Sequence, residues 1–146
     1  MEKSKNNKKT ISSAIGVGFG LLVAFLVKQF VFAPPSFDKQ MVQAAQEINK
    51  SCPIMVDEET RLDSASVFSD NTLQYNYTLI NWTKDSIDLE SFESYMQPVI
   101  LNNVKTSSDM KIYRDNKTSI AYSYNDMNGE FVSKILITAD QYLMEE

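Results

Sequence analysis

Carboxylate side chains crowd one short stretch of the sequence, and they are the first residues that could do chemistry. Asp57, Glu58, Glu59 and Asp63 surround Arg61. In an extended segment these alternate side chains would point the same way, because every second side chain of a strand shares a face: Asp57, Glu59, Arg61 and Asp63. Carboxylate oxygens suit a hard cation or a recognition patch, but EF-hand spacing is missing. We favour a structural patch in which Arg61 pairs with a neighbouring carboxylate, and we expect no metal and no cofactor.

Two pairs of carboxylates are the alternative, because such pairs serve hydrolases and transferases. Asp57 with Asp63, or Asp126 with Glu130, could supply a general acid and a base. Such a pair needs one raised pKa and a pocket. The chain has no histidine, which excludes His-based acid–base catalysis and Ser-His-Asp or Cys-His nucleophiles. We therefore expect a protein that is not an enzyme, with the carboxylate enzyme as the alternative.

The one cysteine and a group of tyrosines offer less chemistry. Cys52 cannot form an internal disulfide or a thiolate zinc cluster alone. At the C-terminal end of a predicted helix it is on the wrong side of the dipole for an activated thiolate, so we expect an inert thiol. Tyr75, Tyr77, Tyr122 and Tyr124 could form an aromatic surface for a sugar or a peptide. Their strand spacing favours core side chains whose hydroxyls reach the rim.

Charge divides the chain into two parts. Residues 1–33 contain five Lys and one Glu, a net charge of +4, whereas residues 34–146 contain nine basic and eighteen acidic residues, a net charge of −9. An acidic domain would be repelled by a phosphate backbone, so nucleic acid is excluded as a partner. The basic tail is better explained as a topology signal.

The segment 11–33 is predicted to be a transmembrane helix. It is apolar over 11–27, and a helix of 23 residues would be about 35 Å long. Lys8 and Lys9 precede it, which places residues 1–10 in the cytoplasm and the domain at 34–146 outside the bacterial cytoplasmic membrane. A cleaved signal peptide is the alternative, although Pro34 disfavours cleavage.

Small residues line one side of that predicted helix. Ser12, Gly16, Gly20 and Ala24 are spaced by four. Small residues at this spacing let membrane helices pack closely, so the face could support a homo- or hetero-oligomer. Glycine is also common in membrane helices, which is the alternative explanation.

The remaining chain is predicted to be an α+β domain. Helical spacing of apolar residues indicates helices over 36–50 and from Leu89 onward, with Pro98 expected to kink or break the second. Alternation indicates strands over 59–69 and 72–83. Asn128-Gly129 indicates another hairpin, with a primed turn. The order α-ββ-α-ββ predicts helices on a four-stranded antiparallel sheet.

Two patches resemble small uncharacterised bacterial proteins. The first is the stretch 53–63, which matches P-x-M-V-D-x-x-T-R-L-D and follows a helix that ends in Asn49-Lys50. The second is Tyr122-x-Tyr124-x-Asp126-x-x-Gly129. Some members have a cysteine near the C-terminus, where this sequence has Tyr142. The resemblance implies a bacterial origin and a shared fold, and it carries no established activity.

The sequence therefore favours a single-pass membrane protein of unknown activity that presents a small acidic interaction domain to an unknown protein partner. The alternatives are a carboxylate-based hydrolase or transferase, and a module that binds a small ligand between its helices and sheet.

Overall fold

The first helix shows how the apolar pattern becomes packing. In the computed structural model, which describes residues 36–144, α1 spans Phe37–Ser51. Met41, Ala45 and Ile48 are buried on one side of α1, at the spacing of successive helical turns. This stripe packs against β2, so the predicted helix over 36–50 is confirmed.

Five strands form one mixed sheet in the order in which they occur along the chain. The strands are β1 (Ile54–Met55), β2 (Thr60–Phe68), β3 (Thr72–Leu79), β4 (Ser119–Asp126) and β5 (Phe131–Ile137). The pairs β2–β3 and β4–β5 are antiparallel hairpins, as predicted, whereas β3 and β4 are parallel. The prediction of a four-stranded antiparallel sheet is therefore wrong.

The crossover between the hairpins explains the parallel pair. α2 (Leu89–Thr106) has 18 residues, so at ~1.5 Å per residue it is about 27 Å long. It carries the chain back along the whole sheet, so β4 starts at the end where β3 started. Parallel neighbours need a crossover of this kind. The strand that the prediction did not include is β1. It has two residues, which are too few to show an alternating pattern in the sequence.

Pro98 lies inside α2, and the helix continues through it. A kink or a break is expected near Gln97 from the sequence, and the structure shows no break there. Pro98 is exposed, so the carbonyl that loses its partner inside the helix can be solvated. The shorter elements are η3 (Lys84–Ser86), η4 (Ser108–Met110), α3 (Lys111–Asp115) and α4 (Ala139–Leu143).

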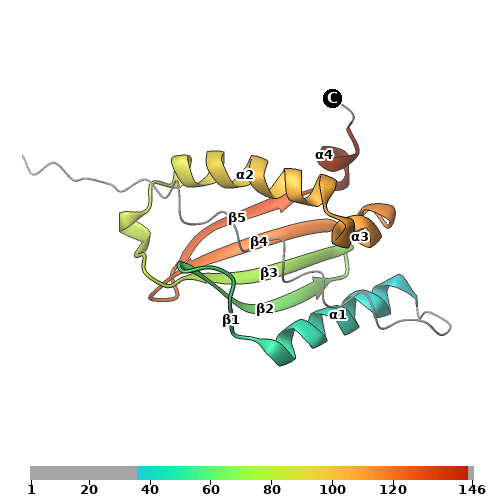
Figure 1. Ribbon diagram of the computed structural model, residues 1–146, viewed down its shortest axis with the longest axis horizontal. Coiled ribbons are helices and arrows are strands. Elements are labelled where there is room, and N and C mark those ends of the chain that lie inside the picture. The colour runs from blue at the N-terminus through green and yellow to red at the C-terminus, as the bar shows by residue number, and fades with distance from the viewer. Residues whose placement is uncertain (1–35, 145–146) are drawn as a thin grey trace, which may run out of the picture.

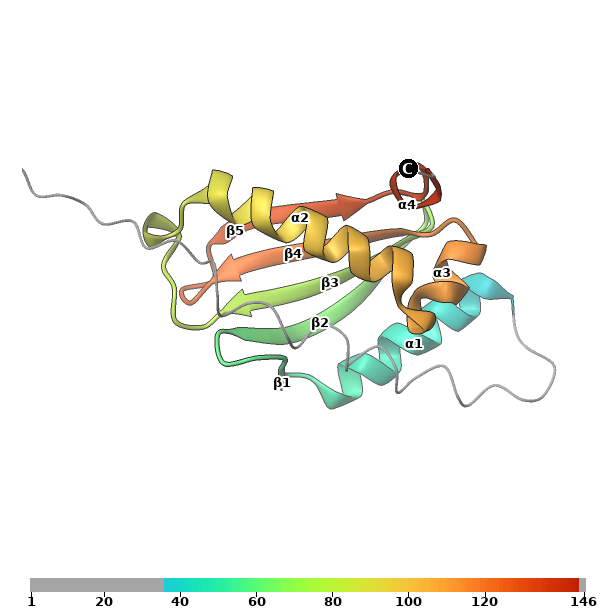
Figure 2. The same ribbon diagram turned by 45° about the horizontal axis from the view of Figure 1, so that its top comes forward.

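The helices lie on one side of the sheet. α1 lies beside β2 in both views (Figures 1 and 2), and α2 passes in front of β4 and β5 in Figure 2. The side chains that the strands point to this side form the core, including Leu73, Leu79, Ile120 and Ile137, all fully buried. No described helix covers the opposite side of the sheet in these views, and we call that side the helix-free face.

The turn between β4 and β5 contains Asn128-Gly129, as predicted. Gly129 has a φ of 83°, whereas Asn128 is not among the residues with positive φ. Both primed turn types need positive φ at the first central residue, which here would be Asn128, so the prediction of a primed turn at Asn128-Gly129 is wrong. The Gly129 N–H donates to the Asp126 carbonyl at 3.0 Å. The turn therefore spans 126–129, and its central residues are Met127 and Asn128 in place of the predicted Asn128 and Gly129.

Within residues 36–144 no helix combines the length and apolar character needed to cross a bilayer. The predicted helix 11–33 and the association face of Ser12, Gly16, Gly20 and Ala24 lie outside the described residues. The single-pass topology is therefore corrected: the structure shows an α+β domain without a described membrane-spanning helix, and neither that topology nor association through such a helix is carried further.

Candidate functional site

The predicted patch of Asp57, Arg61 and Asp63 is split by the structure. Arg61 Nε donates to Asp63 Oδ1 at 2.5 Å, and both side chains are partly exposed on the helix-free face. Asp57 instead lies in the loop before β2, where its Oδ1 accepts the Glu59 N–H at 2.8 Å. The strand begins only at Thr60, so the alternation expected from Asp57 onward does not hold. Arg61 therefore pairs with a neighbouring carboxylate, and the structural role of this pair stays a prediction.

Asp126 holds loops together. Its carboxylate is fully buried and accepts backbone N–H groups from Lys84, Asn128 and Glu130 at 2.8–2.9 Å. Burial alone would raise its pKa, but these donors outweigh burial and hold the pKa below its usual range. A general acid needs the opposite shift. The geometry therefore gives Asp126 a structural role and does not pair it with Glu130 for catalysis.

The same end of the sheet is tied at a second point, which the sequence did not reveal. Glu59 Oε2 accepts hydrogen bonds from Asn81 Nδ2 at 2.9 Å and from Trp82 Nε1 at 3.0 Å. The Met127 N–H donates to the Trp82 carbonyl at 2.9 Å. Three loops that are distant in sequence are thereby fastened together, and Glu59 is the acidic side chain of the stretch 57–59 that takes part.

The four tyrosines form one cluster on the helix side of the sheet. Tyr75, Tyr77, Tyr122 and Tyr124 are all 5% exposed or less, with neighbouring ring centroids 5.4–6.3 Å apart. Phe92 of α2 packs edge-on against Tyr124 at 5.1 Å. These rings are core, as we favoured, but their hydroxyls do not reach an exposed rim.

Burial keeps these hydroxyls neutral. It raises the pKa of Tyr75 and Tyr124 well above the usual value and that of the neighbouring Tyr113 to about 12. The hydroxyls of Tyr75 and Tyr124 are buried without a hydrogen-bond partner. Burial, with a contribution from Asp63, also raises the pKa of the Cys52 thiol. None of these groups is activated as a nucleophile or base at neutral pH.

The helix-free face carries a network of uncharged polar side chains. Gln74 Nε2 donates to Asn76 Oδ1 at 2.7 Å, and Asn76 Nδ2 donates to Ser64 Oγ at 3.0 Å. Thr78 Oγ1 donates to Asp63 Oδ2 at 2.5 Å, which links the network to the Arg61–Asp63 pair. The amides and hydroxyls of β2 and β3 are therefore ordered by each other.

Exposed apolar side chains surround this network. Phe68, Phe131 and Leu136 are 46%, 54% and 43% exposed, and the strand register places them on the helix-free face with Gln74, Ser123 and Asn125. Met55, 48% exposed, lies opposite Arg61. Lys134 Nζ lies 5.7 Å from the centre of the Phe68 ring. Large exposed apolar groups gathered on one face are typical of an interaction surface.

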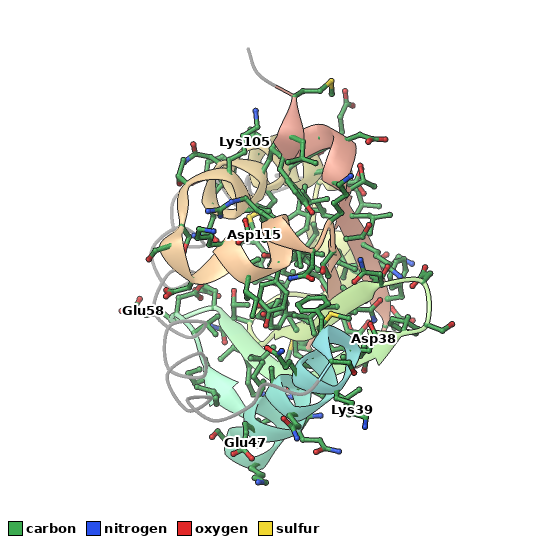
Figure 3. The ribbon with its side chains drawn as sticks, turned by 90° about the vertical axis from the view of Figure 1, so that its right-hand side faces the viewer. Asp38, Lys39, Glu47, Glu58, Lys105 and Asp115 are labelled. Carbon is green, nitrogen blue, oxygen red and sulfur yellow. The ribbon has the colours of Figure 1, made fainter. Side chains whose placement is uncertain are left out.

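Charge avoids the same face. Within residues 36–144 the strands point Arg61, Asp63 and Lys134 to it, whereas the other acidic residues lie on helices, loops or the helix side. Figure 3 shows examples of such outlying charges, with Asp38 and Glu47 on α1 and Glu58 in a loop. Depletion of charge with enrichment of Phe, Met and Arg is the composition of protein interfaces.

Sequence reasoning missed this face, although a signal was present. Ser, Asn and Gln are poor strand formers, yet they occupy alternate positions at Ser64, Ser66, Gln74, Asn76, Ser123 and Asn125. A sequence that breaks local preference at one set of positions often does so for function.

Solved structures with a similar fold include a bacterial protein described as secreted and two pilotins of type II secretion systems. The crystal structure of a Pseudomonas aeruginosa protein described as secreted has a TM-score of 0.61 at 13% identity, covering 75% of this chain and 99% of that chain. A type II secretion system pilotin from Vibrio cholerae gives 0.54 at 12% identity, covering 71% and 90%. A type 2 secretion system pilotin from Vibrio vulnificus gives 0.55 at 10% identity, covering 74% and 93%. At this identity the likeness establishes a shared fold.

These neighbours bear on two expectations: that the protein is not an enzyme, and that it lies in the bacterial cytoplasmic membrane. Two of them are named as pilotins rather than as enzymes. Their descriptions do not match the predicted location in the bacterial cytoplasmic membrane, and that location is not retained. No curated protein matches the chain.

The family assignment rests on sequence. Residues 36–132 match a family described as a domain of unknown function, DUF8479. The match covers α1, all of β1 to β4 and the start of β5, and it spans well over half of the chain. This chain belongs to the DUF8479 family.

Proposed function

We propose that this domain is a non-catalytic protein-binding module that acts as an accessory factor of a bacterial secretion machinery. The observation that carries the proposal is the helix-free face, where exposed apolar groups surround an ordered, nearly uncharged polar centre. The shared fold with two pilotins supports the class of process in which such a module would work.

The exposed side chains define how this face would bind. Phe68 lies on β2 and Phe131 on β5, the two outer strands of the four long ones. Each of these side chains exposes about half of its surface. Exposed rings contribute strongly when a partner desolvates them. The polar centre between them supplies directional hydrogen bonds, which set the register of a partner rather than its affinity.

The carboxylates argue against the enzyme alternative. Asp126 is locked by backbone donors, Asp63 is paired with Arg61 and Thr78, and Asp57 accepts a hydrogen bond in its own loop. Of the two candidate pairs, only the Asp57 Oδ2 atom is buried without a hydrogen-bond partner, and Glu130, the proposed partner of Asp126, is exposed. We therefore advance no second function.

Site-specific photo-crosslinking in cells tests the proposal. A photoreactive phenylalanine analogue at position 68 or 131 should crosslink to a protein partner, which mass spectrometry then identifies. The matched controls are positions 42 and 143, because Val42 and Leu143 are 43% and 51% exposed but lie on helices. Crosslinking from the controls without crosslinking from 68 and 131 would overturn the proposed surface.

A further inference from the structure

We infer that the helix-free face binds a second copy of this chain, sheet against sheet. The inference rests on the proposed function, since it names a partner for the same surface. A weak homodimer of this kind would cover the face until another partner replaces the second copy.

Charge decides which surfaces of two copies can meet. Residues 36–144 contain sixteen acidic and nine basic residues, a net charge of −7, so two copies repel each other in most orientations. On the helix-free face Arg61 and Lys134 outnumber the single acidic side chain, Asp63. Two copies that meet through this face therefore keep the acidic residues of their helices and loops apart.

The polar centre of the face is chemically self-complementary. The side-chain amides of Gln74, Asn76 and Asn125 each carry both donors and an acceptor, as do hydroxyls. Ser123 and Asn125 make no side-chain hydrogen bond within the described part of the chain, so their groups are available to the other copy. The Gln74–Asn76–Ser64 network is already ordered, which lowers the entropy lost on binding.

A two-fold axis parallel to the strands gives the apolar groups partners. Such an axis places β2 of one copy over β5 of the other. Arg61 and Phe131 lie at the same end of the sheet, because Arg61 pairs with Thr78 and the neighbouring Asn125 pairs with Phe131. Each Arg61 would then lie over a Phe131 ring, a favourable cation–π arrangement.

The size of the face sets the strength of the dimer. Four strands of about seven residues cover on the order of 14 Å by 23 Å, roughly 300–400 Å² on each copy. Stable interfaces bury about 800 Å² on each partner. We therefore expect a reversible dimer that forms only as concentration rises.

Analytical ultracentrifugation of the full-length chain, compared across concentrations with two charge variants, tests the inference. Ser123→Glu puts two like charges at the centre of the interface and should weaken dimerisation by at least about tenfold. Ser94→Glu is the matched control, because Ser94 is exposed on α2, and it should leave the dimer constant within about twofold. This contrast also separates a dimer of this face from association through residues outside it.

A crosslinking variant provides an independent result, whatever the folding of Ser123→Glu. In a Cys52→Ser background, a bis-maleimide crosslinker should join Ser123→Cys to a second copy and should not join Ser94→Cys; a crosslinker is needed because stacked sheets lie about 10 Å apart, too far for a direct disulfide. A chain that sediments as a monomer throughout, or a dimer insensitive to Ser123→Glu and not trapped by Ser123→Cys, would overturn the inference. A monomer whose positions 68 and 131 still crosslink to another protein would overturn the inference and leave the proposed function intact. If the chain neither dimerises nor crosslinks to another protein from positions 68 and 131, the inference and the proposed function are both overturned.

Discussion

The side chain of Asn49, near the end of α1, pairs with both backbone groups of Ala65 in β2. Asn49 Nδ2 donates to the Ala65 carbonyl at 2.9 Å, and the Ala65 N–H donates to Asn49 Oδ1 at 2.7 Å. β1 has two residues, Ile54 and Met55, which pair with Leu62 and Arg61. Past Leu62 no described strand pairs with this edge of β2. There the Asn49 side chain bonds the Ala65 backbone in the way that a neighbouring strand would. Open strand edges promote aggregation, so this contact protects the sheet.

Replacing Asn49 should therefore cost stability. Asn49→Ala leaves the N–H and the carbonyl of Ala65 without these partners, and we expect a loss of about 1–3 kcal/mol in the free energy of unfolding. Urea denaturation measures it. Gln46→Ala, on the exposed side of the same helix, should change stability by less than about 0.5 kcal/mol. Equal losses in the two variants would contradict the role of Asn49.

Acid should unfold the domain in part through Asp126. Its pKa is lower in the folded chain than in the unfolded chain, so the folded state binds fewer protons. The stabilisation is complete above the ordinary aspartate pKa and is lost as pH falls through the folded pKa. Asp126→Asn should lower the urea midpoint at neutral pH and flatten the fall in stability below about pH 4. Asp85→Asn, an exposed change in the adjoining loop, should leave both unchanged. An acid profile of Asp126→Asn that matches the parent chain would contradict the clamp.

Gly129 tests the observed turn. At a φ of 83° an added Cβ meets no heavy atom within 4 Å, so the cost of a side chain is backbone strain alone. Gly129→Ala should cost about 1–2 kcal/mol and Gly129→Asn less, because Asn tolerates positive φ. Thermal unfolding of the two variants gives the comparison. Asn128→Ala should cost less than Gly129→Ala, and the reverse order would restore the primed turn.

Two buried tyrosine hydroxyls should respond in opposite ways to removal. Tyr142 donates to the Thr118 carbonyl at 2.9 Å, so Tyr142→Phe should cost about 1 kcal/mol. The Tyr124 hydroxyl is buried without a partner, so Tyr124→Phe should be neutral or stabilising. Chemical denaturation of both variants checks the contrast. A larger loss at Tyr124 than at Tyr142 would mean that the Tyr124 hydroxyl has a partner in solution.

Local patterns in the sequence predict the elements well and their arrangement less well. Helical spacing locates α1 and the start of α2, where the Asp88 carboxylate caps the helix by accepting the Ser91 N–H. Alternation locates both hairpins. The parallel pairing of β3 and β4 follows from where a long crossover ends, which alternation within a strand does not encode.

The polar side chains are harder to place, because a single irregularity reverses every later position in a strand. The register of β2 shifts between Leu62 and Ser64, so Leu62 and Ala65 are both buried while Phe68 points to solvent. From alternation alone Phe68 shares a face with Leu62 and belongs to the core. The same shift hid the helix-free face, because it moves Ser64 and Ser66 away from the side on which Leu62 lies.

Co-purification with matched surface variants tests the central claim, that the helix-free face binds protein. Phe68→Ser with Phe131→Ser removes two exposed rings from the face, and Val42→Ser with Leu143→Ser removes two similarly exposed apolar groups from helices. After confirmation of equal thermal stability, the partner identified by crosslinking is quantified with each affinity-tagged full-length chain. The account predicts a loss of at least about tenfold with the first pair and recovery at the parent level with the second. Undiminished recovery with Phe68→Ser/Phe131→Ser, or loss confined to Val42→Ser/Leu143→Ser, would contradict it.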